Sequence, residues 1–289
     1  MARISAPAKV NLRLRVLTRR PDGYHEIDTF FQAIDLTDEV TVRLGASGIR
    51  LDVSGFDVGP SEENLAYRAA QRFAARIGLR EGVDIELVKR IPAGAGLGGG
   101  SSDAAAVLIG LAALEGVPMD DPRLGQAATE LGSDVPFFLG SSSLARGRGR
   151  GERLDPLEPL PAADLVLVSP PVHVSTAGAY AALAASRRQL EQDEDPVPEP
   201  RSWSDVVAHA RNDFQPVVTR AHPEVSRAIG ALEGSGATLV LMSGSGSSVF
   251  GVFTDAVAAR AAADSLGGAL GWPCRAQRTL TRMPVPILT

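Results

Sequence analysis

The chain has 289 residues, enough for one large or two ordinary domains, and 44% of them are hydrophobic and 22% charged, as in globular proteins. The net charge of −5 gives no electrostatic basis for binding nucleic acid, and no run approaches the roughly 18 apolar residues of a membrane span. The single Cys274 excludes an internal disulfide and the first residues carry no apolar leader, so we expect a cytoplasmic protein.

The N-terminal segment alternates apolar and polar side chains. The apolar positions from Val10 to Leu14 predict a strand over residues 2–17 with one buried face. Lys9 and Asn11 then share the opposite face, because strand side chains alternate. There they are either solvated or functional, and spacing alone does not separate the two.

A turn signal at residues 21–23 precedes Tyr24 and His25. Strands are predicted to follow through residues 30–34 and at residues 39–44. A lone histidine after a turn is more often structural than functional. Its neighbours Tyr24 and Phe31 make a base-stacking pocket the competing interpretation.

A short strand is predicted within residues 48–60, a helix from about 62 to 77, and a strand at 83–88. The stretch that follows reads PAGAGLGGGSSDAAAVL from Pro92, with five glycines between residues 94 and 100. A helix is predicted to begin at Ser101 and run to about residue 115. Backbone N–H groups and the positive helix end converge there, which predicts an anion site, most often for phosphate.

Other glycine-rich phosphate loops fit this stretch poorly. No lysine lies in or after the loop, which excludes the Walker motif. Residues 94–99 satisfy G-x-G-x-x-G, but they are not in the first strand–helix unit, and no strand with an acidic end follows at the right distance. The chain also lacks the H-R-D and D-F-G elements of protein kinases.

A second helix is predicted over residues 121–131, ending at Gly132. Asp134 follows as a lone acid, either a helix-cap or turn residue or a catalytic group. Residues 146–153, RGRGRGER, alternate arginine and glycine. A turn between strands, with an arginine near phosphate, explains them better than a nucleic-acid segment does.

The last third alternates strands and helices. A strand at residues 165–168 is followed by a helix beginning at Ser175 and Thr176, with Tyr180 in its second turn. An acidic, proline-rich stretch at residues 191–200 predicts a mobile loop, and residues 212–216 a polar break. Helices are predicted at 203–209, 223–234 and 254–266, and strands at 238–242, 249–253 and around 274–280. Residues 164–280 therefore read as one α+β unit.

Three motifs in order resemble the GHMP kinase superfamily: residues 7–12, the phosphate loop 92–102, and the glycine-serine loop 242–248. Within it the chain resembles the 4-diphosphocytidyl-2-C-methyl-D-erythritol kinase family of the non-mevalonate isoprenoid pathway. The segments that carry this closer resemblance are 21–25 with 31–32, 64–65, 98–103, 133–136 and 212–213. The resemblance covers essentially the whole chain.

The resemblance implies a two-domain α+β fold. Residues 1–155 would form an ATP-binding α/β domain like that of ribosomal protein S5. Residues 156–289 would form a ferredoxin-like α+β domain that completes the substrate site. The implied reaction transfers the ATP γ-phosphoryl group to the tertiary 2-hydroxyl of the methylerythritol unit, with Mg²⁺ bridging phosphate oxygens.

The resemblance also implies residue roles. Asp134 would be the general base with Lys9 as its partner, and Asp103 would be helical and face away from the phosphates. ATP would contact Asn64, Lys89, Pro92, Gly94, Gly96, Leu97, Gly98, Gly99, Gly100, Ser101 and Ser102. The cytidyl substrate would contact Asn11, Tyr24, His25, Phe31, Thr176, Tyr180 and Gly244.

No protein ligand for Mg²⁺ stands out, and the hydroxyls of Ser101 and Ser102 are the candidates. We expect a small-molecule substrate, no nucleic acid or membrane partner, and a monomer or homodimer. The alternatives are another GHMP small-molecule kinase, of the homoserine or mevalonate type, and a non-catalytic nucleotide-binding regulator on the same fold.

Overall fold

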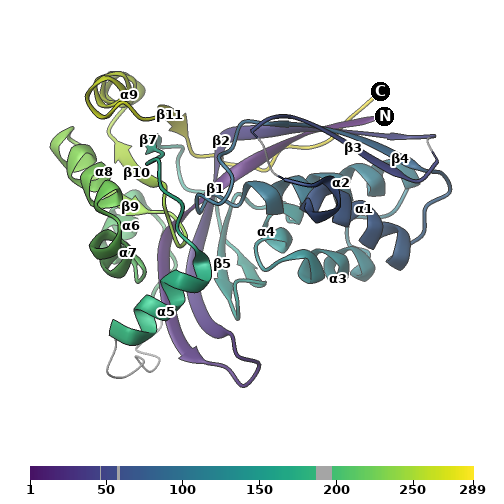
Figure 1. Cartoon of the computed structure of the whole chain (residues 1–289), viewed down its shortest axis with the longest axis horizontal. Coiled ribbons are helices and arrows are strands. Elements are labelled where there is room, and N and C mark those ends of the chain that lie inside the picture. The colour runs from purple at the N-terminus through teal and green to yellow at the C-terminus, as the bar shows by residue number, and fades with distance from the viewer. Residues whose placement is uncertain (46, 57–58, 187–196) are drawn as a thin grey trace.

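The computed structural model describes residues 1–45, 47–56, 59–186 and 197–289, and contains two β-sheets with helices packed on them (Figure 1). The strands are β1 Ala2–Arg19, β2 His25–Leu44, β3 Ile49–Gly55, β4 Val83–Lys89, β5 Leu144–Arg148, β6 Arg153–Pro156, β7 Asp164–Val168, β8 Arg211–Asn212, β9 Leu239–Met242, β10 Val249–Phe253, β11 Cys274–Arg278 and β12 Ile287–Leu288. The helices are η1 Ser61–Glu63, α1 Leu65–Arg76, α2 Gly99–Glu115, α3 Pro122–Leu131, α4 Val135–Leu139, α5 Thr176–Ser186, α6 Trp203–His209, α7 Gln215–Ala221, α8 Pro223–Gly234 and α9 Ala256–Leu270.

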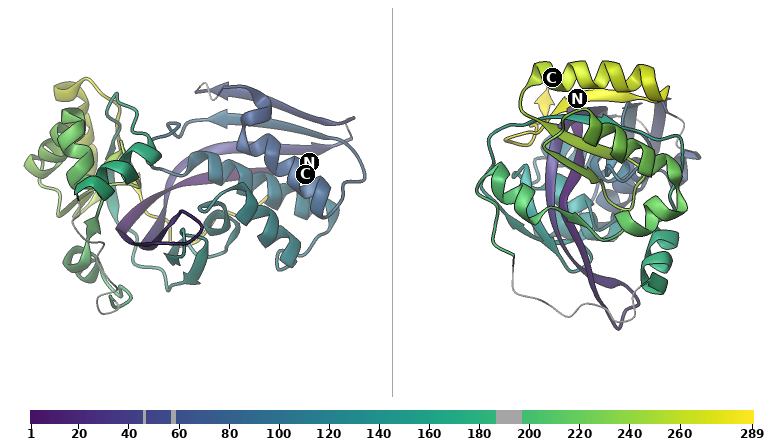
Figure 2. Two further views of the ribbon diagram at one scale, coloured as in Figure 1. Left: turned by 60° about the horizontal axis from the view of Figure 1, so that its bottom comes forward. Right: turned by 90° about the vertical axis from the view of Figure 1, so that its left-hand side faces the viewer.

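The larger sheet has the order β12-β1-β2-β4-β3, with β5 and β6 continuing from β2 and the short β8 parallel to β1. Helices α1 to α4 lie on one face of it (Figure 1). The two chain ends meet at its edge, where the Met1 amino group donates to the Thr289 carbonyl oxygen at 2.6 Å (Figure 2).

The smaller sheet is antiparallel with the order β11-β7-β10-β9. Its strands follow the chain as β7, β9, β10 and β11, so the spatial order is fourth, first, third, second, with α8 and α9 packed on one face. This is the ferredoxin-like arrangement, and the predicted C-terminal α+β unit is confirmed. The other face of the small sheet packs against β1 and β2, which joins the two halves of the molecule.

The first strand departs from its prediction. Instead of one buried face, β1 is buried on both faces, and Lys9 and Asn11 are only 3% and 2% exposed. Helix α2 covers one face and the small sheet covers the other. The two strands predicted within residues 25–44 are also wrong as separate elements, because β2 runs through as one strand.

Other elements differ at their ends. The polar break at 212–216 is wrong in part, because it holds β8 and the start of α7, which the sequence did not predict. Helix α2 begins at Gly99, two residues before the predicted Ser101. Arginines 146–153 do form a turn between strands, the hairpin of β5 and β6. Of the predicted mobile loop, residues 191–196 lie outside the described residues.

Among the described residues, no helix is both long and apolar enough to cross a membrane.

Candidate active site

A cavity of about 630 Å³ lies where β1, the glycine loop and the C-terminal half meet. Segments far apart in the chain line it: Lys9 and Asn11 from β1, Gly94, Gly96, Gly98 and Ser101, Gly132 to Asp134, Arg150, His173 to Ala177 with Tyr180, and Gly244 with Ser245. The predicted phosphate loop and the predicted catalytic pair therefore open into one space.

The glycine loop is bent by three residues with positive φ, Gly94, Gly96 and Gly98, at 64°, 79° and 71°. At Gly96 a Cβ would lie 2.1 Å from the carbonyl oxygen of Ser243, so only glycine fits against the opposite loop. Gly98 caps α2, whose first-turn N–H groups have no acceptor within the helix. These groups and the positive helix end form an anion site.

The glycine-serine loop 243–248 holds the phosphate loop in place. The Ser243 hydroxyl donates to the Gly96 carbonyl oxygen at 2.9 Å, and the Ser248 N–H donates to the Ala95 carbonyl oxygen at 3.2 Å. Asn212 holds the second loop in turn, donating from Nδ2 to the carbonyl oxygens of Met242 and Gly244. Each loop fixes the other, although about 150 residues separate them.

Lys9 and Asp134 form an ion pair at the cavity, with 3.5 Å between Nζ and Oδ2. The Lys9 ammonium also donates to Asn11 Oδ1 at 2.8 Å and to the Gly96 carbonyl oxygen at 3.0 Å. It is thereby fixed next to the phosphate loop, with a cation where anionic phosphate would enter.

The structure separates the two interpretations of Asp134. This residue precedes α4, but its side chain makes no capping hydrogen bond. It lines the cavity with 29% of its side chain exposed and is held by Lys9 instead. A carboxylate that is not used as a cap and faces a cavity is available for chemistry.

Asn11 has a positioning role. Its Oδ1 accepts from Lys9 Nζ and from the Gly244 N–H at 2.9 Å, and its Nδ2 donates to Thr29 Oγ1 at 2.8 Å. Both acceptor sites and one of two donors are used within the protein. One N–H remains for the predicted contact with substrate.

Aromatic side chains form the other end of the cavity. Tyr180 stacks on His25 at 4.9 Å and 17° and meets Phe214 edge-on at 4.8 Å. Burial, and then the Asp134 charge, raises the pKa of Tyr180 to about 12, so it stays a neutral hydroxyl donor. Phe31 is fully buried and lines the cavity beneath Lys9. Tyr24 is 55% exposed and does not line the cavity itself.

Four of the predicted ATP residues line the cavity: Gly94, Gly96, Gly98 and Ser101. Two others have partners inside the protein. Asn64 caps α1 by accepting from the Ala66 N–H at 2.9 Å. Lys89 is 4% exposed and lies between Asp38 and Asp103. Neither residue lines the cavity, where their contacts with nucleotide were predicted.

Of the predicted substrate residues, Thr176 and Gly244 line the cavity, and the Thr176 hydroxyl lies 2.9 Å from that of Ser245. Sequence reasoning missed His173 and Ser245, and it placed an arginine of residues 146–153 near phosphate without identifying Arg150. His173 packs over the glycine loop, where a Cβ at Gly94 would lie 3.0 Å from its ring. No motif or residue spacing in the sequence identifies His173 as a site residue. The described residues contain no cluster of three or more His, Cys, Asp or Glu able to hold a metal ion.

Beneath the loop, the Lys89 ammonium donates to Asp103 at 2.6 Å and to Asp38, which also accepts the Ile91 N–H at 2.8 Å. As predicted, Asp103 is helical and buried away from the cavity. Burial raises the pKa of Asp103 from its ordinary 3.8 to about 8; Lys89 opposes the rise and Asp38 adds to it. The folded chain thus keeps a proton on this group that the unfolded chain releases.

This proton predicts how stability depends on pH. Because the folded state binds more protons than the unfolded state between about pH 4 and 8, the free energy of unfolding should fall as pH rises through this range. Asp103→Asn resembles the protonated carboxyl and should flatten this dependence. Urea unfolding of both proteins at pH 5 and pH 8 measures it. Equal slopes would contradict the prediction.

Comparisons with known proteins identify the family of the chain. The family model for the N-terminal domain of GHMP kinases matches residues 64–142, and the model for their C-terminal domain matches residues 201–270. The chain is 44% identical over 279 residues to the 4-diphosphocytidyl-2-C-methyl-D-erythritol kinase of Geobacter sp. (strain M21), covering 95% of this chain and 98% of the relative. It is 45% identical over 270 residues to the protein of the same name from Moorella thermoacetica, covering 91% and 94%.

Solved structures give the same result. A crystal structure of 4-(cytidine 5'-diphospho)-2C-methyl-D-erythritol kinase matches with a TM-score of 0.78 and 40% identity, covering 96% of this chain and 98% of that one. A homoserine kinase from Cytophaga hutchinsonii matches with a TM-score of 0.68 at 22% identity, covering 99% and 97%, which shows a shared fold.

Proposed function

The chain belongs to the 4-diphosphocytidyl-2-C-methyl-D-erythritol kinase family of the GHMP kinases, and we propose that its cavity carries out the family reaction with Lys9 and Asp134 as catalytic residues. It is an ATP-dependent small-molecule kinase of the non-mevalonate isoprenoid route. Its substrate is 4-diphosphocytidyl-2-C-methyl-D-erythritol. The acceptor we propose is the 2-hydroxyl of the methylerythritol unit.

The observation that carries the residue assignment is the ion pair between Lys9 and Asp134 beside the phosphate loop. Phosphoryl transfer asks little covalent chemistry of the protein, so positioning and charge stabilisation dominate. The N-terminus of α2 and Gly94 to Ser101 hold the phosphates. Asp134 accepts a hydrogen bond from the acceptor hydroxyl and takes its proton as the hydroxyl oxygen bonds to the γ-phosphorus, whose bond to the bridging oxygen breaks so that ADP leaves. Lys9 orients the Asp134 carboxylate and stabilises the charge that develops on the transferred group.

The aromatic end of the cavity suits the cytidyl group. The stacked His25–Tyr180 pair offers π faces and hydrogen-bonding groups, and Tyr180 is the member of the pair that lines the cavity. We assign His25, Tyr180, Phe31 and Thr176 to the substrate side. Tyr24 does not line the cavity, but its ring lies against the guanidinium of Arg150, which does.

Mg²⁺ fits this site as a partner of ATP and not as an ion held in a protein cage. Ser101 is the candidate hydroxyl ligand because it lines the cavity. The Ser102 hydroxyl is buried, has no hydrogen-bond partner among the residues that the structure describes, and does not line the cavity. When bound, Mg²⁺ neutralises phosphate charge.

A substrate panel tests the function. With ATP, the purified protein should phosphorylate 4-diphosphocytidyl-2-C-methyl-D-erythritol and leave homoserine and mevalonate unchanged, because neither offers a cytosine to the aromatic end. Turnover is followed as ADP release, with the product identified by ³¹P NMR. Phosphorylation of homoserine or mevalonate without the cytidyl substrate would overturn the assignment. An absence of turnover with all three would favour the regulator alternative.

Several expectations stay predictions. They are the division into domains at residues 155 and 156, a cytoplasmic location, a monomer or homodimer, and no nucleic-acid partner. The domain division has to accommodate β8 and β12, which follow residue 156 in the chain but join the larger sheet.

A further inference from the structure

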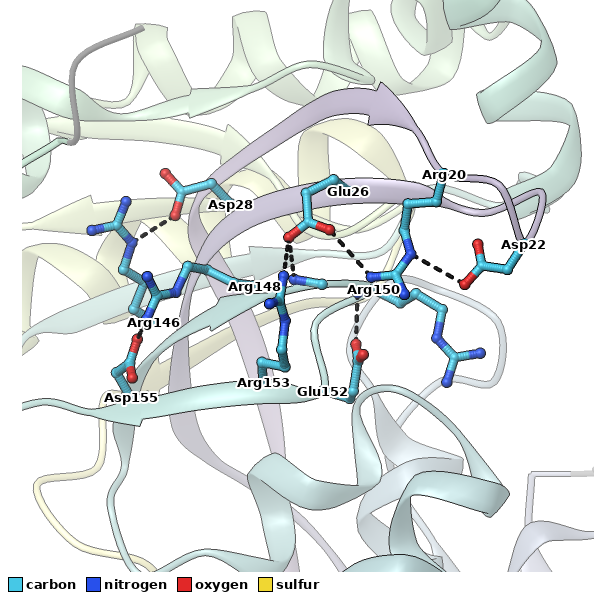
Figure 3. Close-up of polar contacts among 11 residues, drawn as sticks. Arg20, Asp22, Glu26, Asp28, Arg146, Arg148, Arg150, Glu152, Arg153 and Asp155 are labelled. Carbon is cyan, nitrogen blue, oxygen red and sulfur yellow. Dashed lines mark hydrogen bonds and ion pairs between the residues drawn. The ribbon is translucent and has the colours of Figure 1, made fainter. Parts of the chain in front are cut away.

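The arginine hairpin, residues 144–156, carries four arginines, of which Arg150 lines the cavity (Figure 3). Three of them are matched by acids. Arg146 Nε lies 2.7 Å from Asp28 Oδ1, Arg148 pairs with Asp155, and Arg153 pairs with Glu26. These pairs hold the hairpin together and against β2.

Arg150 differs from the other three. Among the described residues, its guanidinium has no ion pair with a carboxylate, and no dashed line reaches it in Figure 3. The nearby Glu152 carboxylate accepts the backbone N–H of Arg150 at 2.6 Å instead. The guanidinium lies over the Tyr24 ring at 4.8 Å, and Arg150 lines the cavity.

The charged residues that line the cavity indicate what kind of ligand Arg150 binds. Among the described lining residues, Lys9, Arg150 and Asp134 are the only lysine, arginine and carboxylate side chains. Lys9 and Asp134 pair with each other, which leaves the Arg150 charge uncompensated. A half-buried cation without a carboxylate at the wall of a cavity favours an anionic ligand.

The position of the hairpin indicates which anion Arg150 can reach. The turn that carries Arg150 packs on β2: the Ile27 N–H donates to the Gly149 carbonyl oxygen at 2.7 Å, and a Cβ at Gly151 would lie 3.4 Å from the Phe31 ring. Strand β2 also begins at His25, so Arg150 stands on the aromatic side of the cavity. The phosphates of ATP already have the backbone donors of the glycine loop.

We infer that Arg150 binds the diphosphate of the cytidyl substrate and thereby sets specificity for a nucleoside diphosphate over a free nucleoside. This inference rests on the proposed function for the identity of the substrate. The planar guanidinium can donate two parallel hydrogen bonds to phosphate oxygens, and the Tyr24 ring holds it in place before substrate arrives.

Comparing the affinity for CDP with the affinity for cytidine separates the contribution of the diphosphate to binding from that of the base. Both are titrated calorimetrically with a saturating non-hydrolysable ATP analogue present, so that CDP does not enter the ATP side. Arg150→Met should weaken CDP binding about tenfold or more and leave cytidine binding unchanged, since hydrogen bonds to charged groups are the strong ones. Arg148→Met, which removes a hairpin arginine that does not line the cavity, should change neither. Arg150→Lys should retain part of the CDP affinity.

Kinetics give a second readout. Arg150→Met should raise KM for the cytidyl substrate about tenfold, with kcat and KM for ATP within about twofold of wild type. Equal loss of CDP and cytidine affinity would assign Arg150 to the base, and a change confined to KM for ATP would assign it to the nucleotide; either result overturns the inference, as does unchanged CDP binding. If wild type binds CDP but phosphorylates none of the panel substrates, the proposed function fails while the CDP comparison still decides the role of Arg150.

Discussion

Replacing Asp134 with asparagine is expected to lower kcat at least about 100-fold, because general-base catalysis by a positioned group is typically worth that much or more. Asparagine keeps the size of the side chain and removes the carboxylate that Lys9 holds at 3.5 Å. KM for ATP should change little, since we assign the binding of the phosphates to the phosphate loop and α2. Steady-state kinetics with the cytidyl substrate and ATP measure both constants.

The stability of this variant distinguishes catalysis from capping. The Asp134 side chain makes no capping hydrogen bond, so Asp134→Asn should leave the free energy of unfolding within about 0.5 kcal/mol of wild type. Asp121 provides the matched control, because its side chain accepts from the Arg123 N–H at 2.9 Å as the cap of α3. Asp121→Ala should cost about 1 kcal/mol of stability and leave kcat unchanged. Unchanged turnover in Asp134→Asn would remove Asp134 from the role of base.

The sequence predicted those parts of the site that lie in continuous motifs. The glycine loop, Lys9 and Asp134 each stand in a short segment of recognisable pattern, and all of them line the cavity. The partners of Lys89 could not be predicted in this way. Asp38 is 51 positions away from it, and only the pairing of β2 with β4 brings the two side chains together.

Arg150 and His173 illustrate a second limit. Four arginines in RGRGRGER look alike in sequence, and only the positions of Asp28, Asp155 and Glu26 show which three are neutralised. Likewise, alternation along β1 predicted only one buried face, because a pattern within one strand carries no information about the distant loops that cover Lys9 and Asn11, such as those of Gly96 and Gly244. Periodicity indicates local structure, whereas the tertiary contacts decide burial and pairing.

Replacing Gly96 with alanine is expected to abolish most of the activity through the contact between the two loops. The new Cβ would lie 2.1 Å from the Ser243 carbonyl oxygen, 2.9 Å from its carbon and 3.1 Å from the Gly246 oxygen, all of them backbone atoms. The phosphate loop therefore has to move away from residues 243–246. Because Lys9 Nζ donates to the Gly96 carbonyl oxygen, the Lys9 ammonium, which we propose is catalytic, should shift with it. A displacement of about 1 Å is enough to lower kcat/KM about 100-fold.

A variant at Gly116 provides the control that separates the effect of this steric clash from the effect of backbone strain. Its φ of 69° is close to the 79° of Gly96, but a Cβ there would meet nothing within 4 Å. Gly116→Ala should therefore lower the free energy of unfolding only by the cost of placing alanine in the left-handed conformation, about 1–2 kcal/mol. It should leave kcat/KM for ATP unchanged. Gly96→Ala should lose more stability than that and lose activity as well. If the two variants lose equal stability and both keep turnover, the packing of the glycine loop against Ser243 does not position the phosphates.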